Sequence, residues 1–159
     1  MTSQQARAAQ APTPTPTQFA MQAGEGGLAE VQLSQLAQQQ SKSAVVQQFA
    51  RRMVDDHGKA NAELKTIASG KKLALPKEPN AEHQATMQKR QSLTGPEFDA
   101  AYMAAMDKDH KQSIALFEAA AAPDFKDREL QAYAAKTLAV IQEHHQMIEK
   151  TMPTSQASR

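Results

Sequence analysis

An all-α fold is the class that this sequence predicts. Of its 159 residues, 30 are alanine and 20 are glutamine, and both residue types favour helices. Valine and isoleucine together number nine and aromatic residues seven, too few to cover the faces of a β-sheet. Glycine and proline are also absent from 97–122 and from 124–152, and each stretch is long enough for a helix of about 25 residues.

Residues 1–17 end in an alternating Thr-Pro run, which favours extended backbone, so we expect a disordered arm. The arm has no apolar core segment and is therefore not an intact signal peptide. It is either what remains after such a peptide is removed or a native cytosolic N-terminus. We expect one bundle domain over 18–152 and a disordered tail over 153–159.

The first two helices are expected over 18–40 and 44–69, with some loosening of the first around Gly24 and Gly27. Ser43 follows a short turn and suits the N-cap of the second helix. Because the turn is short, the two helices should be antiparallel.

The third long helix should begin at Pro96, a favoured first-turn position. The fourth should span 127–152. Thr94 and Glu97 have the spacing of a capping box. A structureless connection over 70–95 would be unusual, and Asn80 can cap a short helix within it. Two antiparallel hairpins joined by a long crossover with a short helix make a ferritin-like four-helix bundle.

The histidines fall on the apolar stripes of these helices. At about 100° per residue, His57 shares a stripe with Phe49 and Met53, and His110 lies similarly on its own helix. Asp56 and Asp109 lie at the edges of these stripes.

The last long helix carries His144 and His145, which flank its stripe, so four of the five histidines should face one core. The fifth, His83, lies on the crossover. His57 and His110 should lie at one level, whereas His144 is expected about 9 Å from the level of His110.

Several short motifs stand out at 27–30, 49–57, 59–61, 95–102, 109–110, 134–138 and 143–144. Together they resemble the bacterial family of unknown function numbered 4142. The resemblance covers about 18–150 and implies an exported, usually periplasmic or envelope-associated, ferritin-like bundle. It also implies that the family's histidines correspond to His57, His110 and His144, and it marks Gly58 and His145 as departures.

The buried histidines and the carboxylates near them would suit a zinc or copper site. His57, His110 and His144 offer nitrogen ligands, and Asp56, Asp109 or Glu30 would add oxygen ligands. Asp56 and Asp109 are alternatively partners that orient the imidazoles. Met53 and Met106 each precede a histidine by four residues, and such methionines would suit cuprous copper. A purely structural role competes, because core methionines are common filler and a core histidine often pairs with an aspartate.

Composition and motifs exclude several functions. No run of about 18 apolar residues exists, so we expect no transmembrane segment. A formal net charge of +1 argues against a nucleic-acid-binding protein. The lack of cysteine excludes disulfides, thiolate metal sites and a cysteine nucleophile, and it fits the cytoplasm and the periplasm equally well. Val54, Ile141 and Gln142 stand where a di-iron site needs glutamate.

The function expected from the sequence is that of a non-catalytic, exported or envelope-associated helical bundle, with stress-related roles among the candidates. The alternative is a metal-binding module that uses zinc or copper, and a ferritin-like di-metal oxidase fits less well. Candidate partners are a metal ion, a second copy of the chain or an envelope protein. If the histidines are neutral and buried, stability should fall below about pH 6.5.

Overall fold

The computed structural model describes residues 12–152, and within this range it contains five α-helices and no strand. The all-α prediction is therefore confirmed. In chain order the helices are α1 (Pro16–Gln40), α2 (Ala44–Gly70), α3 (Ala81–Gln91), α4 (Gly95–Ala121) and α5 (Arg128–Thr151). The arm and tail expected from the sequence lie mostly outside the described residues, at 1–11 and 153–159.

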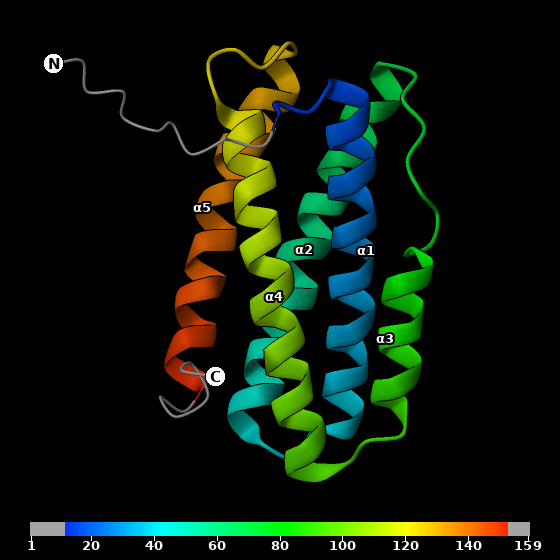
Figure 1. Cartoon of the computed structure of the whole chain (residues 1–159), viewed down its shortest axis with the longest axis vertical. Helices are drawn as coiled ribbons and strands as arrows, with labels where there is room; N and C mark the ends of the chain where they lie inside the picture. The colour runs from blue at the N-terminus through cyan, green and yellow to red at the C-terminus, as the bar shows by residue number, and fades with distance from the viewer. Residues whose placement is uncertain (1–11, 153–159) are drawn as a thin grey trace, which may run out of the picture.

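The four long helices form two hairpins joined by one crossover, as the turn lengths predicted. Helix α1 packs along α2 and α4 along α5, and the hairpins meet through α1 with α4 and α2 with α5. Figure 1 shows the crossover running down the outside of the bundle, with α3 lying against α1. None of the helices in residues 12–152 is long and apolar enough to cross a membrane.

Helix α1 begins at Pro16, two residues before the expected start at 18. The side chain of Thr15 accepts a hydrogen bond from the Gln18 amide at 3.1 Å, and Gln18 Oε1 accepts one from the Thr15 amide at 2.9 Å. This capping box and the tolerance of the first helical turn for proline bring the end of the Thr-Pro run into the helix. The expected loosening at Gly24 and Gly27 does not occur, because α1 is helical throughout.

Side-chain caps start most of the other helices. Ser43 caps α2 and Asn80 caps α3, as predicted, while Asp127 caps α5. The capping box predicted for Thr94 is wrong, because its side chain makes no capping hydrogen bond within the described chain. The following residue, Gly95, has a φ of +59°, which redirects the chain between Thr94 and the first turn of α4.

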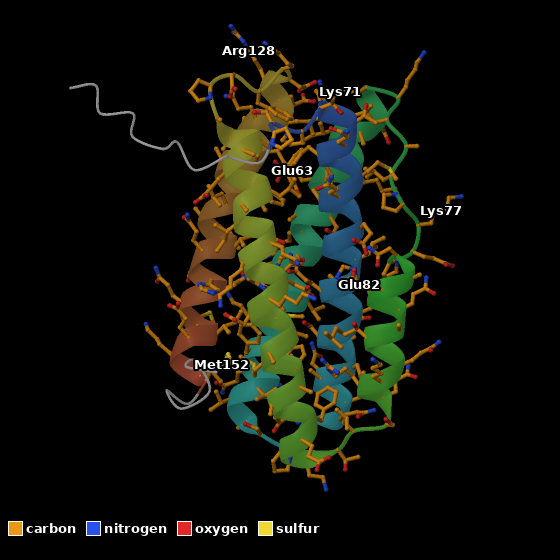
Figure 2. The ribbon with its side chains drawn as sticks, viewed as in Figure 1. Glu63, Lys71, Lys77, Glu82, Arg128 and Met152 are labelled. Carbon is orange, nitrogen blue, oxygen red and sulfur yellow. The ribbon has the colours of Figure 1, made fainter. Side chains whose placement is uncertain are left out.

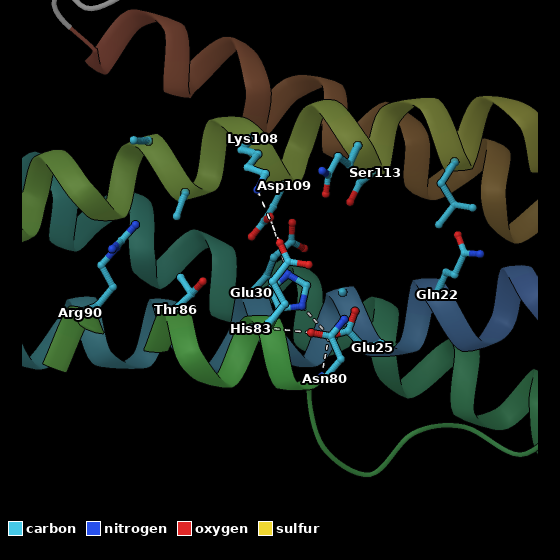
Figure 3. Close-up of a pocket in the computed structure, with 16 residues that line it drawn as sticks. Gln22, Glu25, Glu30, Asn80, His83, Thr86, Arg90, Lys108, Asp109 and Ser113 are labelled. Atoms are coloured by element: carbon cyan, nitrogen blue, oxygen red, sulfur yellow. Dashed lines mark hydrogen bonds and ion pairs between the residues drawn. The ribbon is translucent and has the colours of Figure 1, made fainter. Parts of the chain in front are cut away.

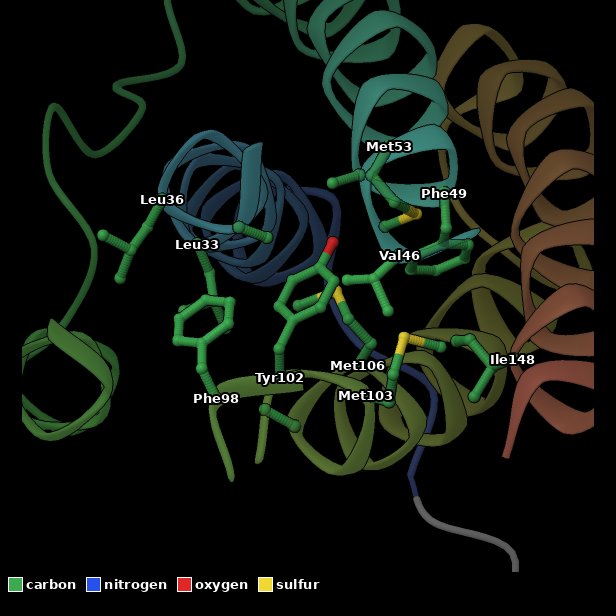
Figure 4. Close-up of a cluster of buried hydrophobic side chains, with 13 residues drawn as sticks. Leu33, Leu36, Val46, Phe49, Met53, Phe98, Tyr102, Met103, Met106 and Ile148 are labelled. Atoms are coloured by element: carbon green, nitrogen blue, oxygen red, sulfur yellow. The ribbon is translucent and has the colours of Figure 1, made fainter. Parts of the chain in front are cut away.

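The core consists of two apolar clusters. The first contains Phe49, Tyr102 and Ile148, and Figure 4 shows its side chains meeting between α1, α2, α4 and α5. The second contains Phe19 and Phe117, whose ring centroids lie 5.1 Å apart edge to face. Figure 2 shows side chains filling the space between the four long helices along the bundle.

Buried polar residues lie between the two clusters on every long helix. On α2 the first cluster ends at Met53 and the second begins at Leu64, with His57 between them. Glu30 on α1, His110 on α4 and His144 on α5 likewise lie between residues of the two clusters. The bundle therefore carries a polar layer across its core at about mid-height.

Candidate metal centre

Three histidines from three helices meet in this polar layer. His57 is 5% exposed, and His110 and His144 are 0% exposed. Each offers one ring nitrogen such that the three atoms lie within 4.8 Å of one another. The ring centroids are 5.1 to 5.6 Å apart.

The expected axial offset of His144 is therefore wrong. Six residues, 122–127, connect α4 to α5, and Phe125 among them is buried in the second apolar cluster. Because this connection is longer than a tight turn, α5 begins beyond the end of α4, as Figure 1 shows. This stagger brings His144 level with His110.

The outer ring nitrogen of each histidine is held by a different acceptor. His57 Nδ1 lies 2.9 Å from Glu30 Oε2, and His144 Nε2 lies 2.8 Å from Asp56 Oδ2. His110 Nδ1 donates to the backbone carbonyl of Met106 at 2.8 Å. An acceptor on one ring nitrogen places the proton there and leaves the other nitrogen with its lone pair.

The inner nitrogens have no such partner. His57 Nε2, His110 Nε2 and His144 Nδ1 are buried and make no hydrogen bond within residues 12–152. The same is true of one carboxylate oxygen of Glu30, Oε1. Leaving a buried acceptor unsatisfied costs roughly 1–3 kcal/mol, so this arrangement calls for an explanation.

Glu30 is a buried carboxylate that remains charged. Burial alone raises its pKa, but the neighbouring imidazoles of His57 and His110 outweigh that effect and lower it to about 2. Its second oxygen, Oε1, lies 3.5 Å from His110 Nδ1. The layer thus holds one fixed negative charge beside the three rings.

The three imidazoles titrate differently. Burial lowers the pKa of His144 to about 4, and burial also lowers the pKa of His110. Burial acts in the same direction on His57, but the Glu30 carboxylate beside it raises the pKa above 6.5 overall. At neutral pH, His110 and His144 are therefore neutral and able to bind a metal through their inner nitrogens.

Asp56 lies at the edge of the layer, as its helical position predicted. Besides His144, its Oδ2 atom accepts a hydrogen bond from Arg52 Nε at 2.8 Å, and Arg52 also reaches Glu143 at 3.0 Å. Of the two roles that the sequence allowed, this geometry matches an orienting partner of His144.

The structure does not bring Asp109 to the three histidines. It lies on the α3 side of α4, where its Oδ1 is 3.6 Å from Nε2 of His83. Nδ1 of the same ring lies 2.5 Å from Glu25 Oε1, so His83 bridges α1 and α4, as Figure 3 shows. The carboxylates of Asp109 and Glu25, which accept hydrogen bonds from the charged His83 ring, raise the pKa of His83 to about 9, although burial opposes this.

His145 also lies outside the layer, so three histidines rather than four share the core. Its Nε2 atom is 3.0 Å from Asp107 Oδ1, between α5 and α4. Met53 and Met106 are fully buried within the first apolar cluster, where they pack as core residues. Two contacts were not predicted from the sequence: the Met106 carbonyl that accepts from His110, and the contacts of His83 with Glu25 and Asp109. A backbone carbonyl carries no side-chain pattern, and the partners of His83 lie on other helices.

The fold and the site define a class of protein: a helical bundle that buries three histidines, each held in place by an acceptor on its outer ring nitrogen. The chain belongs to the family described as "Domain of unknown function (DUF4142)", whose sequence profile matches residues 1–151. The resemblance seen in the motifs is thereby confirmed.

Two further comparisons bear on the fold. No curated protein matches the chain. Among solved structures, a DUF305 protein from Streptomyces coelicolor, described as secreted, matches with a TM-score of 0.69 at 12% identity, covering 82% of this chain and 86% of its own. At this identity the likeness concerns the fold alone.

Proposed function

We propose that this protein is a non-catalytic metal-binding module in which His57, His110 and His144 hold one zinc or copper ion. The observation that carries the proposal is the set of three inner ring nitrogens, which converge within 4.8 Å and have no hydrogen-bond partner among the described residues. A metal ion would occupy the point on which they converge.

A purely structural role explains only half of this geometry. The partners Glu30, Asp56 and the Met106 carbonyl satisfy the outer nitrogens, as in an ordinary buried polar network. Without a metal, the inner nitrogens of the neutral His110 and His144 would remain as neighbouring acceptors, at a cost of roughly 1–3 kcal/mol each. Metal binding replaces these unsatisfied contacts by coordinate bonds, whereas no donor in the described chain does so.

The type of ligand favours zinc or copper. Neutral imidazoles suit both ions, and in metal-bound histidines the N–H of the second ring nitrogen usually donates a hydrogen bond to a carboxylate or a carbonyl group. This is the pattern of all three rings. The buried charge of Glu30 offsets part of the charge of a divalent ion, and the ion displaces any proton on the inner nitrogen of His57.

Metal analysis tests the proposal. Tag-free protein is stripped with a chelator, dialysed against Zn(II) or Cu(II), and assayed for bound metal and for Tm. We expect about one ion per chain and a higher Tm, since a ligand that binds only the folded state stabilises it. The double variant His57→Ala with His110→Ala should lose both effects.

His145→Ala is the matched control, because His145 lies on the next position of α5 but outside the layer. It should retain the bound ion and the shift in Tm. If the wild-type protein takes up no zinc or copper, or if His145→Ala loses as much metal as the double variant, the proposal is wrong.

Export to the periplasm or envelope is part of the same proposal. It is supported by the fold shared with a DUF305 protein described as secreted. Fractionation of bacteria that express the gene from its own start codon tests it. The protein should appear with periplasmic or envelope markers, and recovery in the cytoplasmic fraction alone would contradict export.

A further inference from the structure

A groove of about 510 Å³ lies between α1, α2 and the first part of the crossover. None of the three core histidines lines it, and neither does Glu30 or Asp56, so the metal centre makes no use of it. Its volume falls within the range of about 300–1,000 Å³ that is typical of small-molecule sites.

One end of the groove is formed where the chain turns back at the C-terminus of α2. Lys72 has a φ of +55°, the Leu73 amide donates to the Ala68 carbonyl at 2.9 Å, and the Lys72 amide donates to the Ser69 carbonyl at 3.3 Å. These are the two hydrogen bonds of a Schellman motif. The motif directs the crossover back along α2, and both Leu73 and Ala68 line the groove.

A second wall forms where the crossover packs against α1. A Cβ at Gly24 would lie 3.3 Å from Pro76 Cδ and 3.5 Å from Leu75 Cδ2, so glycine permits this close approach. Leu28, Leu73, Leu75 and Pro76 all line the groove, and each is only partly buried. The groove therefore presents apolar side chains to solvent along its length.

The charged residues of the groove are all positive. Lys65 and Lys77 line it, and no aspartate or glutamate does. Both lysines are exposed, and neither is among the lysines that form ion pairs within residues 12–152. Figure 2 shows Lys77 extending away from the bundle, and the flexible stem of a lysine allows its ammonium group to swing over the mouth of the groove.

The two ends of the chain do not complement these charges. Residues 1–11 and 153–159 contain no aspartate or glutamate, and their charged side chains, Arg7 and Arg159, are both positive. An anionic molecule from outside the chain matches the two lysines, and an apolar chain matches the leucines. The part of α2 that lines the groove, from Asn61 to Ser69, is about 12 Å long, which suits one acyl chain of medium length.

We propose that this groove binds a single-chain amphiphile with an anionic headgroup, such as a medium-chain carboxylic acid. The acyl chain lies along the leucines between α2 and the crossover. The carboxylate lies at the mouth of the groove, where the ammonium groups of Lys65 and Lys77 neutralise it. This site is separate from the metal centre and does not depend on it.

Isothermal titration calorimetry on the full-length, metal-free protein tests the proposal. Sodium dodecanoate is titrated below its critical micelle concentration, beside dodecyltrimethylammonium, which has the same chain and the opposite charge. We expect one dodecanoate per chain and binding of the cation at least about tenfold weaker. Octanoate should bind at least about tenfold more weakly than dodecanoate, because each buried CH₂ contributes about fourfold in affinity.

Two kinds of variant locate the bound acid. Lys65→Glu with Lys77→Glu should weaken dodecanoate binding about tenfold, because two attractive charges become repulsive. Lys42→Glu with Lys89→Glu makes the same change in net charge at two exposed lysines outside the groove and should match the wild type. Ala62→Trp fills the groove from an exposed position, so it should block binding and leave Tm unchanged.

NMR of labelled leucine methyl groups gives a second readout of the position. Dodecanoate should shift the resonances of Leu28, Leu73 and Leu75, which line the groove. The resonances of Leu36, which belongs to the first apolar cluster, should stay in place.

The proposal is overturned if dodecanoate does not bind, if the cation binds as tightly, or if the variant of Lys65 and Lys77 equals its control. Binding to vesicles of phosphatidylglycerol without binding of monomeric dodecanoate would also overturn it, since the lysines would then serve a membrane surface. Because the titrations use metal-free protein, a failure of the metal-binding function leaves these outcomes unchanged.

Discussion

Asp56 of α2 and His144 of α5 are joined by a 2.8 Å hydrogen bond between Oδ2 and Nε2, which fixes the ring in the polar layer. The bond crosses from α2 to α5. It also selects Nε2 as the protonated nitrogen, so Nδ1 faces the other two histidines with its lone pair. An aspartate at the rim thus controls which atom of a buried histidine is available to a metal.

Removing this charge should weaken metal binding. In Asp56→Asn the acceptor is no longer charged, so the ring is less firmly held and less basic. Loss of an outer partner of this kind typically lowers metal affinity 10- to 100-fold. Isothermal titration calorimetry with zinc should show a drop of at least about tenfold, whereas the exposed neighbouring change Asp55→Asn should leave the affinity within about twofold.

The carboxylate of Glu30 should set the protonation of His57. In the wild type, the charge of Glu30 raises the pKa of His57. In Glu30→Gln the side chain keeps a hydrogen-bond acceptor but loses this charge. Burial then dominates, and the pKa of His57 should fall below 6.5. NMR titration of the imidazole carbon shifts in metal-free protein measures this change.

Glu25→Gln is the matched control for this prediction. Glu25 lies on the same helix but contacts His83 and not the polar layer. Its replacement should leave the titration of His57 unchanged. An unaltered pKa of His57 in Glu30→Gln would contradict the charge coupling that the 2.9 Å contact implies.

The stability of the metal-free protein should be greatest near pH 6.5. His144 has a folded pKa of about 4, so its contribution is complete above 6.5 and is lost as pH falls toward 4. His83 has a folded pKa of about 9, so its contribution is complete below 6.5 and is lost as pH rises toward 9. His110 adds to the acid limb and His57 to the alkaline limb.

Urea unfolding in the presence of a chelator, between pH 4.5 and 9.5, checks this curve. His144→Gln should flatten the acid limb, and His83→Gln should flatten the alkaline limb. The slopes are compared rather than the absolute stabilities, because each replacement also changes packing. A wild-type free energy of unfolding that is flat from pH 5 to 8 would argue against burial of these rings.

Two neighbouring glycines of α1 should respond in opposite ways to alanine. A Cβ at Gly27 would lie 2.0 Å from Asn61 Oδ1 and 2.9 Å from its Cγ, so the Asn61 side chain must move. At Gly26 a Cβ meets no atom of the described chain within 4 Å. Gly27→Ala should therefore destabilise by about 1–2 kcal/mol, and Gly26→Ala should stabilise by about 0.5–1 kcal/mol.

Denaturant unfolding at pH 7 measures both changes. The pair is informative because helix propensity alone would stabilise both variants by similar amounts. Equal stabilisation would mean that α1 and α2 do not approach closely at Gly27.

Much of the fold was predictable because its signals are local. The gaps between prolines and glycines located the long helices, and Ser43 and Asn80 marked two of the starts correctly. The prediction for Thr94 failed because the spacing of a capping box does not reveal the backbone angle of Gly95.

The candidate site was only partly predictable. Helical periodicity placed His57 and His110 on buried faces, since the period of a helix follows from its own backbone geometry. It misplaced His145, which pairs with Asp107, and it put Asp109 with the wrong histidine. Asp109 and His110 are neighbours in sequence, yet about 100° of helical rotation sends one toward α3 and the other into the core.

The sequence by itself determined the helical class, the two hairpins and the burial of His57 and His110, because these follow from composition and local spacing. Tertiary structure alone decided that His144 is level with His110, that Glu30 holds His57 and that the inner nitrogens lie within 4.8 Å of one another. These features depend on the stagger and rotation of helices distant in the chain. Packing between side chains sets both quantities, and no short stretch of sequence encodes them.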